Sequence, residues 1–340
     1  IAGWTFSHVF VEIFTFVGWQ STADLLADSG NGYGNAIFAI LFMSLTIMII
    51  RGGVSEGIER ATKLMMPLLV LILLIMTIYV VFQPGASEGL GVYLKPDFSM
   101  ITGELVLAAL GQAFFSLSLG MGALITYGSY LSKKENIVEA ASFVTLADVG
   151  IAFLAGLLIM PTIFLAQAQG VEIYDASGNF LAGPALIFQI LPELFSQMGG
   201  VLGLTIGISF FFLLSLAALT STISLLEVPT SYIIDEHGVR RKKAALYVGL
   251  TVLTISIIIS FNTWLIVNID YIFSVIGLPL GGLLICIFIG YFWKTRSAVE
   301  EMKNGFKDIR DSWFTTVWSV FIKYICPIII LIILAQTIFG

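Results

Sequence analysis

Residues 104–131 read ELVLAALGQAFFSLSLGMGALITYGSYL, an apolar stretch with a polar, glycine-rich centre. As one continuous helix these 28 residues would measure about 42 Å, roughly a third more than the hydrocarbon core of a bilayer. The centre, Ser116–Gly122, contains two serines and two glycines, which favour an unwound segment. A break there would free backbone carbonyls and amides to bind an ion or a carboxylate. Glycines at this spacing equally allow close helix packing, so the spacing alone leaves both interpretations open.

The composition of the whole chain agrees with a membrane location for this stretch. Only 11% of the 340 residues are charged and 58% are hydrophobic, whereas a soluble domain has about 25% charged residues. Long apolar runs with almost no charge recur, for example at 68–82, 250–259 and 328–338. Because a helix needs roughly 20 apolar residues to cross a bilayer, the composition predicts an integral membrane protein and excludes a water-soluble one.

The apolar runs predict nine membrane-spanning segments. They are 1–24, 35–50, 64–82, 104–131, 137–167, 204–234, 244–261, 265–293 and 314–339. A helix satisfies its own backbone hydrogen bonds in lipid. The predicted fold class is therefore an all-α integral membrane protein, a helical bundle of about nine spans.

Nearly all basic residues lie in alternate loops. Of the 16 Lys and Arg residues, 14 fall in the loops 51–63, 132–136, 237–243 and 294–313. The positive-inside rule places these loops in the cytoplasm, which predicts a multi-pass protein of the cell (plasma or inner) membrane. The connections on the opposite side are longer, and residues 168–203 are predicted to form an extracellular loop with short helices.

A second group of small polar residues lies at 217–222, which read AALTST. Ala217 and Ser221 are four residues apart, so they share one helix face, and Thr220 lies beside them. Hydroxyl and carbonyl oxygens suit a hard cation such as sodium. Helix hydroxyls also bond back to the carbonyls of their own helix, and the sequence does not choose between these two roles.

Asp148, Glu227 and Asp270 are acidic residues within predicted spans. A charged side chain at the bilayer midplane costs about 2.5–3.5 kcal/mol on insertion scales. Asp148 and Glu227 have no evident basic partner within their own spans, which makes them functional candidates. Asp270 lies near the outer end of its span, so a position at the membrane–water interface explains it equally well.

The cysteines and histidines indicate no enzyme and no zinc centre. Cys286 and Cys326 are the only cysteines, and both lie in apolar segments, which favours packed thiols over a disulfide or a metal site. His8 and His237 are far apart in the sequence, with no nucleophile or metal-ligand spacing around them. We expect a protein without catalytic residues.

Several of these stretches together resemble the neurotransmitter:sodium symporter family. Residues 111–122, running on to 126–130, are similar to the broken sixth helix of that family. Residues 51–60, RGGVSEGIER, resemble the loop between its fourth and fifth helices, and residues 217–236 resemble its eighth helix. Asp270 followed by Gly277 resembles the tenth helix. The resemblance covers the whole chain, from the family's third helix to its eleventh.

The resemblance implies a single transmembrane transporter domain over residues 1–340. Its fold would be the inverted-repeat transporter fold, lacking the first two helices and most of the third. The substrate carboxylate and both sodium ions would normally bind the unwound part of the first helix, so each of the two sodium sites is incomplete. The chain also opens on Ile1 without a methionine, and we expect an N-terminally truncated fragment.

The resemblance also implies roles for individual residues. The substrate-binding positions are Phe115 (an aromatic lid), Ser116, Ser118, Gly120, Met121, Gly122, Leu124, Ser221 and Leu225. The sodium-binding positions are Ser116, Asp148, Ala217, Thr220 and Ser221. The gate positions are Phe115 and Asp270 on the extracellular side and Tyr130 and Asp235 on the intracellular side.

One departure from the family pattern concerns chloride. The seventh helix of the family usually supplies an asparagine to the first sodium site, where this chain has Ala147-Asp148. We hypothesise that Asp148 supplies negative charge near the ion, so that chloride is not required, as is typical of prokaryotic members.

The predicted function is sodium-coupled symport of a neutral, hydrophobic or aromatic amino acid by alternating access. Met121, Leu124 and Leu225 favour an apolar substrate side chain. One alternative is a proton-coupled carrier that uses Asp148 or Glu227, and another is a channel or receptor-like membrane protein. The expected partners are the lipid bilayer and a small-molecule amino acid, with no nucleic acid; the oligomeric state and the particular amino acid stay open.

Overall fold

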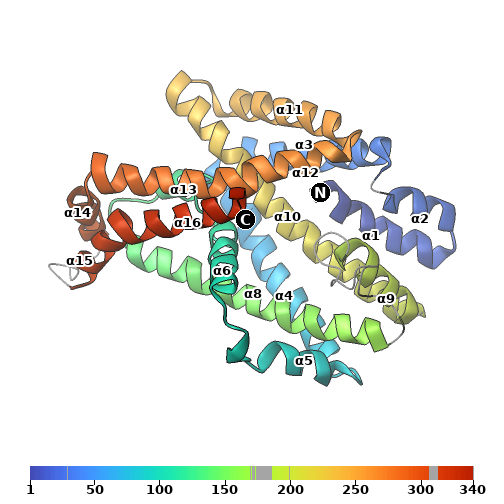
Figure 1. The fold of residues 1–340 in the computed structure, drawn as a ribbon. Coiled ribbons are helices and arrows are strands. Elements are labelled where there is room, and N and C mark those ends of the chain that lie inside the picture. The colour runs from blue at the N-terminus through green and yellow to red at the C-terminus, as the bar shows by residue number, and fades with distance from the viewer. Residues whose placement is uncertain are drawn as a thin grey trace. The chain divides into compact units, whose positions relative to one another are not determined.

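The computed structural model describes residues 1–28, 30–168, 170, 173, 186–198, 200–305 and 313–339. Within these residues every regular element is helical, in agreement with the predicted class (Figure 1). The α-helices up to residue 168 are α1 Ala2–Val17, α2 Gln20–Ala27, α3 Gly32–Arg51, α4 Arg60–Val81, α5 Ala86–Leu94, α6 Gly103–Ser116, α7 Ala123–Ser129 and α8 Ile137–Ala168. The later ones are α9 Leu191–Met198, α10 Gly200–His237, α11 Arg241–Ser260, α12 Thr263–Asp270, α13 Leu278–Ile287, α14 Thr295–Gly305, α15 Trp313–Val320 and α16 Cys326–Phe339.

Shorter helical segments connect several of these helices. The π-helical ones are η1 Val54–Glu59, η3 Leu186–Ile190, η4 Tyr271–Gly277, η5 Phe288–Phe292 and η7 Phe321–Ile325, and a 3₁₀ turn, η2, covers Phe98–Met100. Each of the π-helical segments continues directly into, or out of, an α-helix, so they lengthen helices instead of ending them.

Seven helices among the described residues are long and apolar enough to cross a membrane, by length and composition. They are Gly32–Arg51, Val54–Val81, Ile137–Ala168, Gly200–His237, Arg241–Ser260, Trp264–Phe292 and Trp313–Ile338. Each corresponds to one predicted span. The two remaining predicted spans, 1–24 and 104–131, are each divided into two shorter helices, α1 with α2 and α6 with α7. The total of nine spans stays a prediction.

The chain divides into two compact units, and α8 passes from one to the other. Unit 1 comprises Ile1–Pro96 and Ile151–Thr263. Its central helix is α10, which packs against α1, α3, α4 and α11 (Figure 1). Buried apolar side chains, such as Leu73 of α4, Ile163 of α8 and Phe211 of α10, form its core. Because lipid is as apolar as these side chains, close packing holds the helices together in a membrane.

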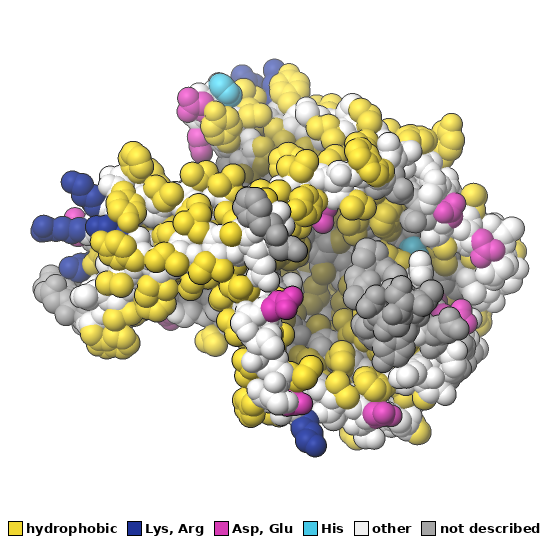
Figure 2. All heavy atoms as spheres, viewed as in Figure 1, with side chains coloured by type: hydrophobic (Ala, Val, Ile, Leu, Met, Phe, Trp, Pro, Cys, Tyr) yellow, Lys and Arg dark blue, Asp and Glu magenta, His cyan; other side chains and the backbone are white. Residues whose placement is uncertain are grey.

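Unit 2 comprises Asp97–Gly150 and Trp264–Gly340. Here α13 packs against α16 and α6, around a small core of Leu283, Cys286, Ile330 and Leu334. Figure 2 shows apolar side chains over α13 and α16, and Lys and Arg side chains at the end of the unit that carries α14. The positive-inside rule predicts that a basic end of this kind lies on the cytoplasmic side. The single transporter domain predicted for residues 1–340 stays a prediction.

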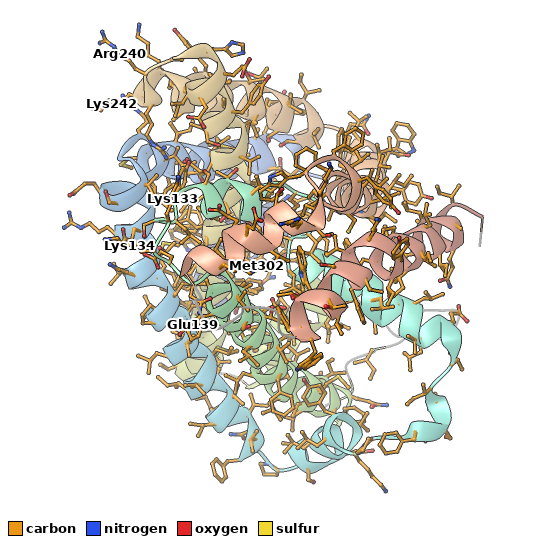
Figure 3. The ribbon with its side chains drawn as sticks, turned by 90° about the vertical axis from the view of Figure 1, so that its left-hand side faces the viewer. Lys133, Lys134, Glu139, Arg240, Lys242 and Met302 are labelled. Carbon is orange, nitrogen blue, oxygen red and sulfur yellow. The ribbon has the colours of Figure 1, made fainter. Side chains whose placement is uncertain are left out.

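The described residues include only part of the predicted loops. Of the predicted extracellular loop 168–203, η3 and α9 are described, whereas Asp175–Gly178 lie outside the described residues. Of the basic loop 294–313, Lys307 and Arg310 lie outside them as well. In Figure 3, Lys133 and Lys134 lie in the loop between α7 and α8 of unit 2, and Arg240 and Lys242 lie at the start of α11 in unit 1. Their location in the cytoplasm stays a prediction.

Candidate binding site at a broken helix

The predicted break in residues 104–131 is confirmed. Helix α6 ends at Ser116 and α7 begins at Ala123, which leaves 117–122 outside both helices. Three residues of this segment have left-handed backbone conformations, with φ of 54° at Ser118, 88° at Gly120 and 83° at Gly122. Glycine adopts such conformations without a steric penalty. The glycines therefore allow the helix to unwind here, which is one of the two interpretations that the sequence left open.

Gly120 has a second role, because its backbone touches the start of α13. A Cβ atom on Gly120 would overlap the carbonyl oxygen of Leu278 and would lie 2.9 Å from the amide nitrogen of Gly282. A Cβ atom on Gly281 would in turn lie 2.6 Å from the carbonyl oxygen of Gly120. The broken segment and α13 are thus in direct backbone contact. Both interpretations of the glycines, unwinding and close packing, hold at this one residue.

Ser116 and Asp148 are brought together at the start of the break. The Oγ atom of Ser116 lies 2.8 Å from Oδ1 and 2.9 Å from Oδ2 of Asp148, so the serine hydroxyl donates to this carboxylate. The contact joins the last residue of α6 to α8 across 32 positions of sequence. A carboxylate and a hydroxyl beside an unwound backbone supply the oxygen donors that a hard cation such as sodium prefers.

The other candidate residues of unit 2 flank the break. Phe115 and Leu124 lie on either side of it, with exposed fractions of 51% and 45%, and Met121 lies within it. Tyr130 is the C-cap residue of α7, directly after its last residue, Ser129. Asp270 is the last residue of α12 and accepts a hydrogen bond of 2.7 Å from the hydroxyl of Ser274.

The remaining candidates lie on α10 in unit 1. The hydroxyls of Thr220 and Ser221 both donate to the carbonyl oxygen of Ala217, at 2.8 Å and 3.1 Å. The three oxygens therefore converge on one helix face, as their spacing predicts. The hydroxyls bond back to their own helix, as the alternative interpretation predicts, and their oxygen lone pairs stay available to an ion. Leu225 is half exposed and Asp235 lies in the last turn of the same helix.

Glu227 has a partner that the sequence did not reveal. Its side chain is fully buried, and its Oε2 atom lies 2.6 Å from Nη2 of Arg241. The Nε atom of the same arginine donates to the carbonyl oxygen of Ile50 at 3.0 Å. Arg241 begins the helix after the one that carries Glu227, and the basic run at 240–243 was the only signal for it. Glu227 is consequently part of an ion pair that ties α10, α11 and α3 together.

An all-helical membrane chain with a helix broken at polar and glycine residues has the features of a secondary transporter. Residues 18–339 match the sodium:neurotransmitter symporter family, and the chain belongs to this family. An uncharacterized sodium-dependent transporter of Haemophilus influenzae is 37% identical over 90% of this chain and 66% of its own length. An uncharacterized sodium-dependent transporter, YhdH, of Bacillus subtilis is 33% identical over 86% of this chain and 64% of its own length.

A solved structure is also similar to the chain. The crystal structure of MhsT in complex with L-phenylalanine matches this chain with a TM-score of 0.78 and 36% sequence identity. The match covers 99% of this chain and 79% of the MhsT chain. The predicted family is therefore confirmed, and its members are named as transporters, in agreement with the expectation that the protein is not an enzyme. The chain spans just under two thirds of the length of the two curated relatives.

Proposed function

We propose that this chain contributes ion-binding and substrate-binding groups to sodium-coupled symport of a neutral amino acid with an apolar or aromatic side chain. The observation that carries the proposal is the contact of Ser116 with Asp148 at the end of a broken helix. It joins a negative charge to a hydroxyl beside backbone carbonyls, which suits a sodium ion as cargo. The sodium-dependent names of the relatives support the choice of ion.

In this proposal the two units each contribute part of the ion binding. Ser116 and Asp148 bind one sodium ion, and Ala217, Thr220 and Ser221 bind the second. Inward movement of each sodium ion down the membrane potential contributes about 2.3 kcal/mol per 100 mV. Chloride is not required, because Asp148 already supplies a negative charge.

The substrate would bind at the break itself. Ser118 and the backbone of Gly120, Met121 and Gly122 offer polar groups to its ammonium group, and Leu124 and Leu225 contact its apolar end. Phe115 covers it, with Asp270 on the outer side and Tyr130 and Asp235 on the inner side as gates. The bound L-phenylalanine of the MhsT structure supports an aromatic substrate.

The test is uptake of radiolabelled L-phenylalanine by proteoliposomes that contain the purified product of the full-length gene. We expect an inward sodium gradient at constant pH to drive accumulation, and Asp148→Ala to abolish it. Ser142→Ala is the matched control, since Ser142 lies on the same helix and its hydroxyl donates back to the carbonyl of Val138. Uptake that follows an imposed pH gradient without sodium would support the proton-coupled alternative and contradict the proposal.

A further inference from the structure

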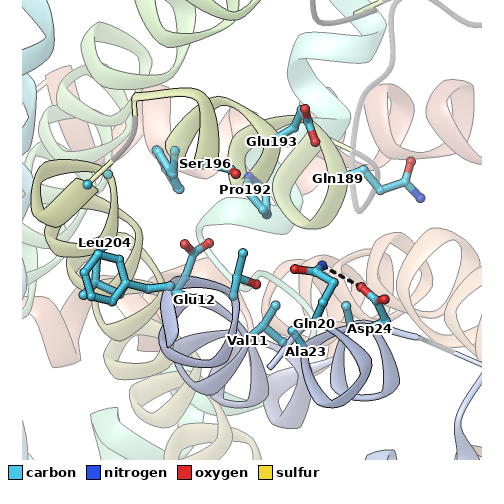
Figure 4. A pocket seen from close by; sticks show the side chains of 16 residues that line it. Val11, Glu12, Gln20, Ala23, Asp24, Gln189, Pro192, Glu193, Ser196 and Leu204 are labelled. Atoms are coloured by element: carbon cyan, nitrogen blue, oxygen red, sulfur yellow. Dashed lines mark hydrogen bonds between the residues drawn. The ribbon is translucent and has the colours of Figure 1, made fainter. Parts of the chain in front are cut away.

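A cavity lies in unit 1, and it shares no residue with the candidate transport site. It has a volume of about 450 Å³ and lies between α1, α2, α9 and α10 (Figure 4). Its size falls in the range of small-molecule sites, about 300–1,000 Å³. The described residues that line it include three carboxylates, those of Glu12, Asp24 and Glu193, and no Lys, Arg or His.

Glu12 is the unusual member of this lining. Its side chain is only 8% exposed, and its Oε1 atom is buried without a hydrogen-bond partner among the described residues. Figure 4 shows its carboxylate pointing from α1 into the cavity, toward α9. A buried polar atom without a partner is costly. Because the Glu12 carboxylate lies on the wall of a cavity of suitable size, a ligand in this cavity can supply the missing donor.

The neighbouring helix, α10, leaves space for this carboxylate. Gly207 of α10 faces Glu12, and a Cβ atom on this glycine would lie only 2.5 Å from Oε2 of Glu12. Any larger residue at position 207 would displace the carboxylate. The absence of a side chain at Gly207 therefore provides the space in which Glu12 sits.

The rest of the lining sets the kind of ligand. Asp24 is already paired with Gln20, whose Nε2 atom donates to it at 2.9 Å. Thr15 and Ser196 add neutral hydroxyls, while Phe16 and Leu204 add apolar surface. A donor with a positive charge and a small apolar body matches this combination. The described residues offer no group of three or more His, Cys, Asp or Glu side chains that could hold a metal ion.

We propose that the Glu12 cavity is a binding site for a small organic cation, a primary ammonium compound with a compact apolar group. The ammonium group donates to Glu12, and the apolar group contacts the Phe16 and Leu204 side of the cavity. The inference does not depend on the proposed transport function, because no residue of the broken-helix site takes part.

The test uses benzylamine, which is an ammonium ion at neutral pH, and benzyl alcohol as its neutral counterpart. Binding to the purified protein in lipid nanodiscs is measured by titration calorimetry, with a thermal-shift assay alongside. We expect benzylamine to bind and benzyl alcohol to bind at least about tenfold more weakly, since a hydrogen bond between two charged groups is stronger than one from a neutral hydroxyl. This comparison needs no variant, so it stands even where a substitution impairs folding. Equal binding of the two compounds would overturn the proposal.

Three variants locate the site. Glu12→Gln and Gly207→Ala should each weaken benzylamine binding about tenfold or more, the first by removing the charge and the second by displacing it. Asp148→Ala should leave the affinity unchanged. Loss of binding in Asp148→Ala with retention in Glu12→Gln would assign the amine to the broken-helix site and overturn the inference without affecting the transport proposal.

Discussion

The ion pair of Glu227 and Arg241 shows most clearly how the structure changes the interpretation of a single residue. The sequence offers Glu227 no evident basic partner within its own span, which favours a role in proton or ion movement. Its partner comes from the first residue of α11, beyond the end of α10. A partner of this kind cannot be found from helix periodicity, because it depends on how the chain turns between two helices.

Removal of one member of this pair should be strongly destabilising. We expect Glu227→Gln to lower the free energy of unfolding by up to about 3–5 kcal/mol, because it leaves the partly buried Arg241, with a side chain 22% exposed, without its counter-ion. Thermal unfolding in detergent, compared with the exposed control Glu59→Gln, measures the change. The double variant Glu227→Gln with Arg241→Met should recover much of the loss. If Glu227→Gln is as stable as the parent protein, the structural role of the pair is wrong.

Asp148 allows a test of the chloride hypothesis at the same scale. An asparagine in place of this aspartate keeps an oxygen near Ser116 but removes the charge. We expect sodium-driven uptake by Asp148→Asn to become chloride-dependent, with a stimulation of roughly tenfold if the lost charge-assisted interaction is worth about 1.5 kcal/mol or more. Uptake by the variant in gluconate and in chloride buffers gives the answer. Chloride-independent uptake at the level of the parent protein would contradict the hypothesis.

At the scale of elements, the break between α6 and α7 was predictable, and the division of the first span was not. Two glycines and two serines in an overlong apolar run left a break and close packing both open. The resemblance to the family favoured the break, and the structure places the interruption at 117–122. In residues 1–24 the division falls at a lone glycine, Gly18, so hydropathy gives one span where the structure has α1 and α2. The hydroxyl cluster on α10 lies between these cases, since its oxygens converge as predicted but already bond to the carbonyl of Ala217.

The contact of the broken segment with α13 leads to a prediction for Gly120. We expect Gly120→Ala to abolish transport, because the added methyl group overlaps the carbonyl of Leu278 and disfavours the left-handed backbone at φ 88°. The strain alone should cost about 1–3 kcal/mol in stability. Gly128→Ala is the control, because a Cβ atom there meets nothing within 4 Å in the described structure. Unfolding temperature and sodium-driven uptake are measured for both, and full activity of Gly120→Ala would argue against the break as the site.

At the scale of the whole molecule, composition and loop charges predicted the membrane class and seven of the spans. They cannot give the pairing of helices within a unit, because similar apolar faces pack in many ways. The candidate site was predictable only through its resemblance to a family. Spacing alone does not bring Ser116 near Asp148, and it gave no indication of the cavity around Glu12.

The predicted orientation can be tested with single cysteines in a background without Cys286 and Cys326. We expect a membrane-impermeant maleimide to label Ser87→Cys in intact cells, and to label Lys134→Cys and Lys242→Cys only after permeabilisation. Ser87 is exposed in α5, and the positive-inside rule predicts that α5 and the basic loops lie on opposite sides of the membrane. Labelling of Lys134→Cys in intact cells would contradict the orientation.

Helices α8 and α10 are so long that their arrangement depends on the thickness of the surrounding membrane. With 32 and 38 residues they extend about 48 Å and 57 Å, against a hydrocarbon core of about 30 Å. Each contains a proline, Pro161 or Pro229. Helices of this length respond to a mismatch by tilting or bending, or by deforming the lipid around them. Acyl-chain length is therefore a mechanical variable for this protein, and bilayers of different thickness will favour different tilts of the two helices.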